Sequence, residues 1–210
     1  MIAGACGSAS TAPARSDAAV APAPNPAPGA VIAASDVTLT SPIASSSASV
    51  APAVALPKDW TAFTSDRFAY SIEHPAGWAE TPAATDWPQT GWPRPDSDAA
   101  DRFVVPGSPG TQLSVSSDVL VADEVVDGRL AEIDQETALV CQISGITAIE
   151  IDGAAGRQNE QLCFGRDHVI EAFVGHADRI YLIYWFSRAP IPEPDRAIFA
   201  EAMDRFRFAD

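Results

Sequence analysis

The most regular hydrophobic pattern in the chain lies near its C-terminal end and is typical of antiparallel strands separated by turns. Residues 179–187 (Arg-Ile-Tyr-Leu-Ile-Tyr-Trp-Phe-Ser) are almost all β-branched, aromatic or large and apolar. Such a run predicts a strand that is covered on both faces. Residues 168–174 have a similar composition, and Gly-His-Ala-Asp at 175–178 supplies turn residues between the two. The pattern therefore predicts that a sheet is the core of the protein.

Weaker patterns precede this region. Within residues 68–72, Phe, Tyr and Ile alternate with small or polar residues, which predicts a strand with one buried face. Pro75 ends this strand because proline cannot donate to the ladder. Residues 79–100 contain four prolines and are expected to form a loop. Short strands are expected at 103–105 and 113–115.

Two stretches have helical periodicity. Val126, Leu130, Ile133 and Thr137 recur at the spacing of one helix face. A last helix is expected after Pro194, because proline suits the first turn of a helix but not its interior. The residues expected on its apolar face are Ile198, Phe199, Ala202, Met203 and Phe206.

Composition divides the chain into two parts. Residues 1–57 are almost entirely Ala, Pro, Ser, Thr, Val and Gly, with no aromatic residue and only Arg15, Asp17 and Asp36 charged. Such a segment buries too little apolar surface to offset the entropy of ordering it. We therefore expect residues 1–57 to be a disordered tether and residues 58–210 to be one globular domain.

The N-terminal residues resemble the end of a bacterial lipoprotein signal peptide. In Ala3-Gly4-Ala5-Cys6, three small residues precede a cysteine. The resemblance implies that the residues before Cys6 are cleaved away and that Cys6 is lipidated. The charged region and apolar segment of a signal peptide are missing before Cys6, so we expect them to be encoded upstream of Met1. The alternative is a chance cysteine in an alanine-rich tail. The lipoprotein interpretation predicts an extracytoplasmic domain, anchored to the outer face of the cell membrane by lipidated Cys6.

The charge of the chain limits its partners. Its formal net charge is −15 at pH 7, whereas a nucleic-acid-binding protein needs a basic surface to neutralise phosphates. We expect no nucleic-acid partner, and contact with the membrane through the lipid anchor only. No run of residues approaches the ~20 apolar positions needed to span a bilayer.

Cys141 and Cys163 flank a predicted hairpin. Asp152-Gly153 tolerates the positive φ angles of a two-residue turn, which places Ile151 opposite Ala154. Counting outward puts Cys141 beside residue 164, one position from Cys163, and a bulge at residues 155–156 would bring the cysteines together. An oxidising compartment favours a disulfide. Two buried thiols are the alternative.

The histidines and acidic residues form no recognisable catalytic or metal-binding motif in the sequence. His168 and Glu171 point to opposite faces of one strand, so they cannot form a dyad. His74 is interpreted as structural, and His176 as a solvated turn residue. His168, His176 and Asp178 could hold a cation, and Asp123, Glu124 and Asp127 could hold calcium. We interpret these acidic residues instead as a solvated face. We expect no cofactor, no metal and no catalytic residues.

Tryptophans on the proline-rich loop are the best candidates for a binding surface. Trp78 follows the turn at Ala76-Gly77, after the strand that ends at Pro75, and is expected to pack on the core. Trp87 and Trp92 lie among prolines, and aromatic residues on such loops are common in binding surfaces. The alternative is that both cover the core of the sheet.

Four stretches of the chain resemble the PsbP-like (Mog1/PsbP-fold) bacterial lipoproteins. They are residues 68–78, ending in His-Pro-Ala-Gly-Trp; residues 149–155, Ile-Glu-Ile-Asp-Gly-Ala-Ala; residues 179–183, Arg-Ile-Tyr-Leu-Ile; and residues 199–208, ending in Phe-Arg-Phe. The resemblance implies an α+β fold, with a central antiparallel sheet of about six strands sandwiched by helices. Its members are mostly binding or assembly proteins.

Together these features predict a non-catalytic envelope lipoprotein. We expect a monomer that binds either an envelope protein or a small apolar ligand. The alternative is an extracytoplasmic enzyme, hydrolase-like, of a type that no motif reveals.

Overall fold

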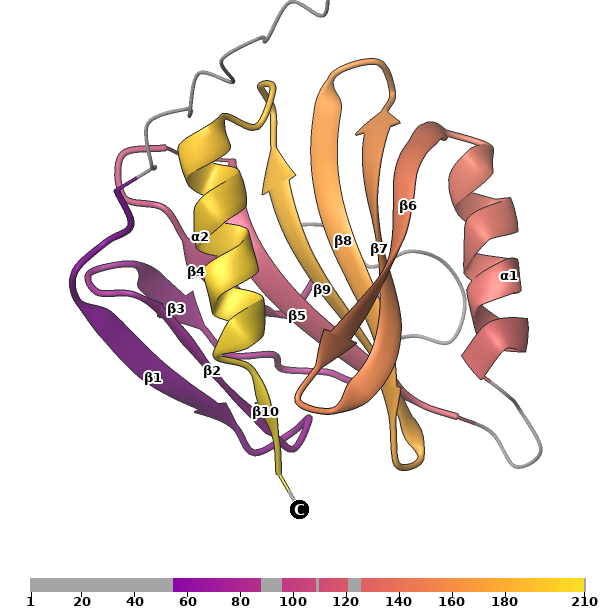
Figure 1. Ribbon diagram of the computed structural model, residues 1–210, viewed down its shortest axis with the longest axis horizontal. Coiled ribbons are helices and arrows are strands. Elements are labelled where there is room, and N and C mark those ends of the chain that lie inside the picture. The colour runs from indigo at the N-terminus through magenta and orange to yellow at the C-terminus, as the bar shows by residue number, and fades with distance from the viewer. Residues whose placement is uncertain (1–54, 88–95, 109, 121–125, 210) are drawn as a thin grey trace, which may run out of the picture. The chain divides into compact units, whose positions relative to one another are not determined.

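The computed structural model describes residues 55–87, 96–108, 110–120 and 126–209 (Figure 1). The helices within them are α1 (Val126–Ala138) and α2 (Glu193–Asp204). The strands are β1 (Trp60–Ser65), β2 (Tyr70–Pro75), β3 (Ala79–Thr81), β4 (Asp101–Val104), β5 (Thr111–Val119), β6 (Cys141–Ile151), β7 (Ala154–Cys163), β8 (Asp167–His176), β9 (Arg179–Ser187) and β10 (Arg207–Phe208). Among these residues, no helix has the length and apolar composition that crossing a bilayer requires.

The strands form two antiparallel sheets. The larger has seven strands in the order β3-β4-β5-β9-β8-β7-β6, and the smaller has three in the order β1-β2-β10. The predicted α+β fold with a central antiparallel sheet and flanking helices is confirmed. The central sheet has seven strands where about six were expected, and the separate three-stranded sheet was not predicted.

Alternation along β9 explains the layered arrangement. Tyr181, Ile183 and Trp185 pack with buried residues of α2 and of the smaller sheet. Their neighbours Ile180 and Leu182 face the other way and pack with buried residues of α1. β9 is therefore covered on both faces, as its composition predicts, and α1 and α2 lie on opposite faces of the larger sheet.

Two turns in the C-terminal half follow the prediction. Ile151 pairs with Ala154 across Asp152 and Gly153, which have φ angles of 47° and 79°. Positive φ at both central positions is what this type of two-residue hairpin turn requires. The β8–β9 turn likewise falls within residues 175–178.

The N-terminal half departs from the prediction. Residues 60–65 form β1, which pairs with β2, and residues 79–81 form β3 where a loop was expected. Pro82 follows β3 directly, so the prolines limit this strand to its three-residue length and do not prevent it. Phe68 lies in the turn before β2, although its side chain is fully buried as predicted.

A disulfide joins the first residue of β6 to the last residue of β7. Cys141 lies directly opposite Cys163, and their sulfur atoms are 2.01 Å apart. The predicted pairing is therefore confirmed, but the bulge that aligns it was placed wrongly. The register shifts between Ser144 and Thr147, whereas residues 155–156 pair regularly. Gly145, with a φ of 62°, supplies the conformation that the bulge needs.

The three tyrosines of the chain give a prediction for alkaline pH. Burial raises the pKa of Tyr70, Tyr181 and Tyr184 above the ordinary value of 10.0, and the adjacent Asp101 carboxylate adds to the effect at Tyr70. Because the folded state holds these protons more tightly, this contribution to stability is complete below pH 10 and is lost as the pH rises further. We expect no tyrosinate absorbance near pH 10. At higher pH, tyrosinate absorbance should appear together with loss of the far-ultraviolet circular dichroism signal. Ionisation of a tyrosine near pH 10 in the native protein would contradict this expectation.

Candidate ligand-binding cleft

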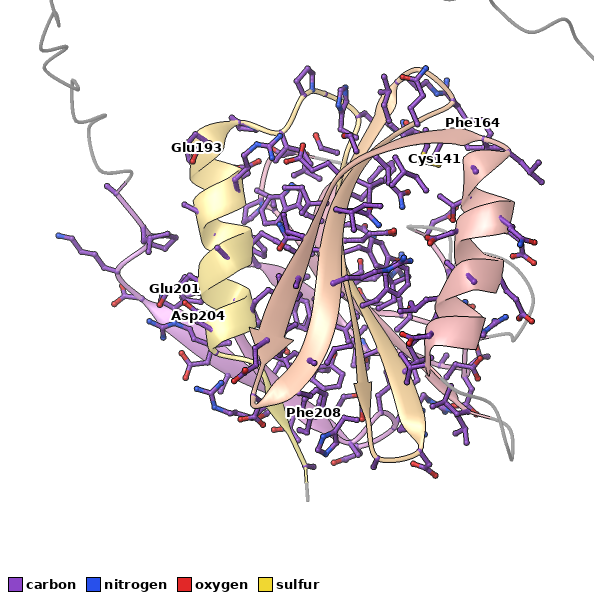
Figure 2. All side chains as sticks on the ribbon, turned by 45° about the vertical axis from the view of Figure 1, so that its right-hand side comes forward. Cys141, Phe164, Glu193, Glu201, Asp204 and Phe208 are labelled. Atoms are coloured by element: carbon purple, nitrogen blue, oxygen red, sulfur yellow. A yellow bond between two sulfur atoms is a disulfide. The ribbon has the colours of Figure 1, made fainter. Side chains whose placement is uncertain are left out.

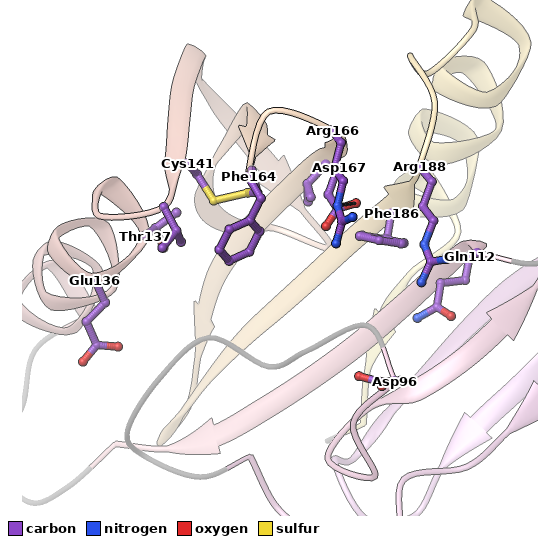
Figure 3. A pocket seen from close by; sticks show the side chains of 14 residues that line it. Asp96, Gln112, Glu136, Thr137, Cys141, Phe164, Arg166, Asp167, Phe186 and Arg188 are labelled. Atoms are coloured by element: carbon purple, nitrogen blue, oxygen red, sulfur yellow. Dashed lines mark ion pairs between the residues drawn. A yellow bond between two sulfur atoms is a disulfide. The ribbon is translucent and has the colours of Figure 1, made fainter.

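Several chain segments end together at one edge of the larger sheet, which is the edge formed by strand ends and not an edge strand. The antiparallel register pairs Thr111 with Ser187 and Ser187 with His168, so β5, β9 and β8 meet there. The disulfide brings the end of β7 and the start of β6 to the same edge. A cleft of about 760 Å³ opens at this edge, on the side that α1 covers (Figure 3).

The floor of the cleft is formed by neighbouring residues of three strands. Val169 pairs with Phe186, and Phe186 pairs with Gln112. All three side chains are buried, and the two apolar ones belong to the core layer beneath α1. The floor is therefore part of the rigid sheet, which is the kind of support that a preformed ligand site needs.

One wall of the cleft presents an exposed aromatic side chain. Phe164 lies in the β7–β8 turn and is 68% exposed, and the side chains of both Cys163 and Phe164 line the cleft. The backbone N–H of Phe164 donates to the carbonyl of Val140, 2.9 Å away, and this hydrogen bond holds the turn against the residues that follow α1. Figure 2 shows Phe164 and Cys141 together at the end of α1 that lies nearest this edge.

The backbone at Phe164 is unusual for a bulky residue. Its φ is 53° and that of Gly165 is 68°, and the Arg166 N–H donates to the Cys163 carbonyl, 3.1 Å away. The first of these positions favours Asn, Asp or Gly, and a side chain such as phenylalanine is strained there by about 1 kcal/mol or more. The exposed ring therefore brings no packing gain that would offset its conformational strain.

Two arginines reach the cleft from different segments. Arg166 belongs to the β7–β8 turn, and Arg188 follows β9 (Figure 3). Arg166 is exposed, and its Nε lies 3.8 Å from an oxygen of Asp167. The carboxylates that line the cleft are Asp96, Glu136 and Asp167.

A row of buried polar side chains lies next to the floor of the cleft, two residues further along β8 than Val169. Glu171 is fully buried and accepts hydrogen bonds from the side-chain amides of Asn159, at 3.0 Å, and Gln161. Its neighbour on β9 is Tyr184, which is also fully buried. Neither Glu171 nor Tyr184 lines the cleft. A molecule in the cleft would therefore meet the apolar floor and not this carboxylate.

Of the two candidate tryptophans, Trp87 does not form part of an exposed surface. Trp87 is only 2% exposed and packs in the core between α1 and the larger sheet, so its prediction as a binding residue is wrong. A tryptophan near prolines can cover a core as readily as it can face solvent, and here the apolar side of α1 supplies the partners. Trp92 lies outside the described residues, as does Cys6. Trp78 packs on the core, with its ring centroid 5.5 Å from that of Trp185.

The histidines lie apart from one another. His74 is buried, with Nε2 3.0 Å from Glu80 and Nδ1 3.1 Å from the carbonyl oxygen of Pro75. The His176 ring stacks on Phe208, with the ring centroids 4.0 Å apart. His168 and His176 lie at opposite ends of β8, roughly 26 Å apart at the usual rise per residue, so they cannot share one cation.

The described part of the chain contains no candidate metal-binding cluster. Within residues 55–87, 96–108, 110–120 and 126–209, no group of three His, Cys, Asp or Glu side chains could hold an ion. Of the acidic residues weighed for calcium, Asp123 and Glu124 lie outside these ranges, and Asp127 is in the first turn of α1.

Comparison with known proteins gives similarity to solved structures only. No sequence-family profile and no curated protein sequence matches the chain. The cyanobacterial PsbP protein (CyanoP) of Synechocystis is 13% identical, covers 71% of this chain and 92% of its own, and has a TM-score of 0.49. LpqN, involved in cell envelope biogenesis of Mycobacterium tuberculosis, is 14% identical over 72% of this chain and 91% of its own, with a TM-score of 0.43. A Pseudomonas aeruginosa protein of unknown function is 17% identical over 69% and 94%, with a TM-score of 0.44.

The residues that line the cleft were not predicted as a site from the sequence. Phe164 and Arg166 lie in the β7–β8 turn and Arg188 follows β9, and these two segments meet only because the strands pair as they do. One signal was present: Phe-Gly at 164–165 stands at a hairpin turn where Asn-Gly would be ordinary. A large aromatic at such a position points to a function for the side chain.

Proposed function

We propose that the protein is a non-catalytic, extracytoplasmic binding module, held at the membrane by lipidated Cys6, and that its cleft binds the apolar part of a small ligand. The observation that carries this proposal is Phe164, an exposed aromatic side chain kept in a strained turn beside a cleft with an apolar floor. Strain that no packing offsets is expected where a side chain serves a function.

The size and composition of the cleft suit a small ligand. Its volume of about 760 Å³ falls in the ordinary range for sites that bury most of a small molecule. Phe164, Val169 and Phe186 would contact the apolar part of such a ligand. The described lining includes no serine, histidine or lysine, and its cysteines are joined in the disulfide. Binding therefore accounts for these residues better than covalent chemistry does.

The disulfide supports the proposed location. Structural disulfides persist in oxidising compartments and are rare in the cytosol. Cys141 and Cys163 are paired across two strands, and the bond lines the cleft. Together with the small residues before Cys6, this pairing favours an exported domain on a tether.

A single substitution separates a functional role of Phe164 from a structural one. In the full chain, Phe164→Asn should leave the free energy of unfolding unchanged or raise it by about 1 kcal/mol, because asparagine tolerates positive φ. The same change should weaken binding of the neutral fluorescent probe N-phenyl-1-naphthylamine about tenfold, a loss of about 1.4 kcal/mol. Urea unfolding and fluorescence titration give the two values.

The matched control is Ile146→Thr, which changes another exposed apolar residue, 63% exposed, on β6 and outside the cleft. We expect this variant to bind the probe as the unchanged protein does. Absence of probe binding to the unchanged protein, or equal binding by Phe164→Asn, would refute the proposal.

A further inference from the structure

We propose that the cleft selects an amphiphile with one terminal carboxylate, of the fatty-acid class, and that Arg188 is the residue that recognises the carboxylate. This inference rests on the proposed function and names its ligand class. The apolar floor accounts for the body of the ligand, and the charges around it decide which end group fits.

Arg188 lacks the partners that most arginines of this protein have. Seven described arginines lie within 4.0 Å of a carboxylate oxygen; they are Arg67, Arg129, Arg157, Arg166, Arg196, Arg205 and Arg207. Arg188 forms neither an ion pair nor a hydrogen bond with any described residue, although the chain has 28 acidic residues. A guanidinium left without an anion in so acidic a protein is available to a ligand.

The position of Arg188 is defined by its aliphatic stem. A Cβ atom added to Gly110 would lie 3.5 Å from Cδ of Arg188, so the stem rests on this glycine and the guanidinium extends beyond it. Figure 3 shows the side chains of Arg166 and Arg188 both directed into the cleft, with Phe186 between them. Two guanidinium groups beside an apolar floor suit a ligand with one charged end.

The acidic residues of the cleft decide between a singly and a doubly charged end group. Asp96, Glu136 and Asp167 also line the cleft, and Asp167 lies 3.8 Å from Arg166. The three carboxylates outnumber the two arginines by one negative charge, so they would repel a dianion such as a phosphate monoester more strongly than a monoanion. A carboxylate carries one charge, and its two oxygens match the planar fork of arginine.

The geometry also sets the direction of the ligand. The carboxylate would lie between Arg188 and Arg166, near the Gln112 side of the cleft. The chain would extend over Val169 and Phe186 towards Phe164, where further exposed apolar residues lie. Val140, which lines the cleft, is 45% exposed, and Leu139 beside it, which follows α1, is 84% exposed.

A pair of ligands with the same chain, one ending in a carboxylate and the other in its neutral methyl ester, tests the proposal. Cis-parinaric acid and its methyl ester share one fluorescent chain, and only the acid is an anion. The full-length protein should bind the acid about tenfold more tightly than the ester, the scale of one charge-assisted hydrogen-bonded pair. In Arg188→Gln this preference should disappear while affinity for the ester stays the same. Lys58→Gln, which removes one positive charge outside the cleft, should keep the preference.

The outcomes separate this inference from the function on which it rests. If the unchanged protein binds acid and ester equally, selection of a carboxylate is refuted, but a cleft for apolar ligands stands. A preference that persists in Arg188→Gln would also refute the role of this residue. If neither compound binds and N-phenyl-1-naphthylamine also fails to bind, both the inference and the proposed function fall.

Discussion

Replacing Trp87 with alanine should lower the free energy of unfolding by about 3–5 kcal/mol, as expected for a large buried aromatic side chain. Trp87 is 2% exposed and packs with Leu130 and Ile133 of α1 and with the larger sheet. The Arg129 guanidinium lies 6.0 Å from the centroid of its ring and would lose this contact as well. Equilibrium unfolding in urea gives the value directly.

The control for this prediction is another aromatic residue in a different environment. Phe164→Ala removes a side chain that is 68% exposed, and its effect on stability should stay within about 0.5 kcal/mol. A loss of less than about 1 kcal/mol for Trp87→Ala would contradict the burial of Trp87 and would make it a candidate binding residue again.

Removing the disulfide should be the second large effect. Replacing both Cys141 and Cys163 with serine is expected to cost about 3 kcal/mol of stability, because the bond closes a loop with a sequence separation of 22. β6 is the edge strand of the larger sheet, and the disulfide fixes its first residue to β7. Without the bond, the start of the edge strand and the adjoining wall of the cleft lose their covalent link to β7.

Reduction provides the comparison for this second prediction. The unchanged protein should unfold at a lower urea concentration when dithiothreitol is present, and the double serine variant should not respond to dithiothreitol. If the oxidised and reduced forms of the unchanged protein unfold at the same urea concentration, the disulfide contributes nothing to stability and the prediction is wrong.

The C-terminal half of the fold could be predicted because its sequence signals are local. Asp152-Gly153 defines a hairpin by its own backbone preference, and the composition of residues 179–187 defines a strand buried on both faces. The apolar positions of α1 and α2 likewise follow from helical spacing. In each case the deciding interaction lies within a few residues of the chain.

The N-terminal half depends on contacts that sequence spacing does not show. β3 has only three residues and exists because β4 pairs with it. β10 joins β2 from the other end of the chain and completes a sheet that local periodicity cannot reveal. The prediction placed the bulge at residues 155–156 and not in β6 for a related reason. Gly145 and Gly156 both suit a bulge, and only the pairing of β6 with β7 decides between them.

The cleft could not be predicted because its residues are brought together by strand register. Arg166 and Arg188 are ordinary exposed arginines when each is considered in its own segment. Their common position follows from the pairing of β8 with β9, in which His168 lies opposite Ser187. Phe164 was detectable in principle, since an aromatic residue at a turn position that favours asparagine is unusual.

The claim that this cleft is the binding site is tested most directly by nuclear magnetic resonance. The isotope-labelled full chain would be titrated with N-phenyl-1-naphthylamine while the backbone amide signals are followed. We predict saturable shifts at Phe164, Val169 and Phe186, with the signal of Phe208 on β10 unchanged. Shifts centred on another surface, or no saturable shifts at all, would contradict the assignment of this cleft as a ligand site.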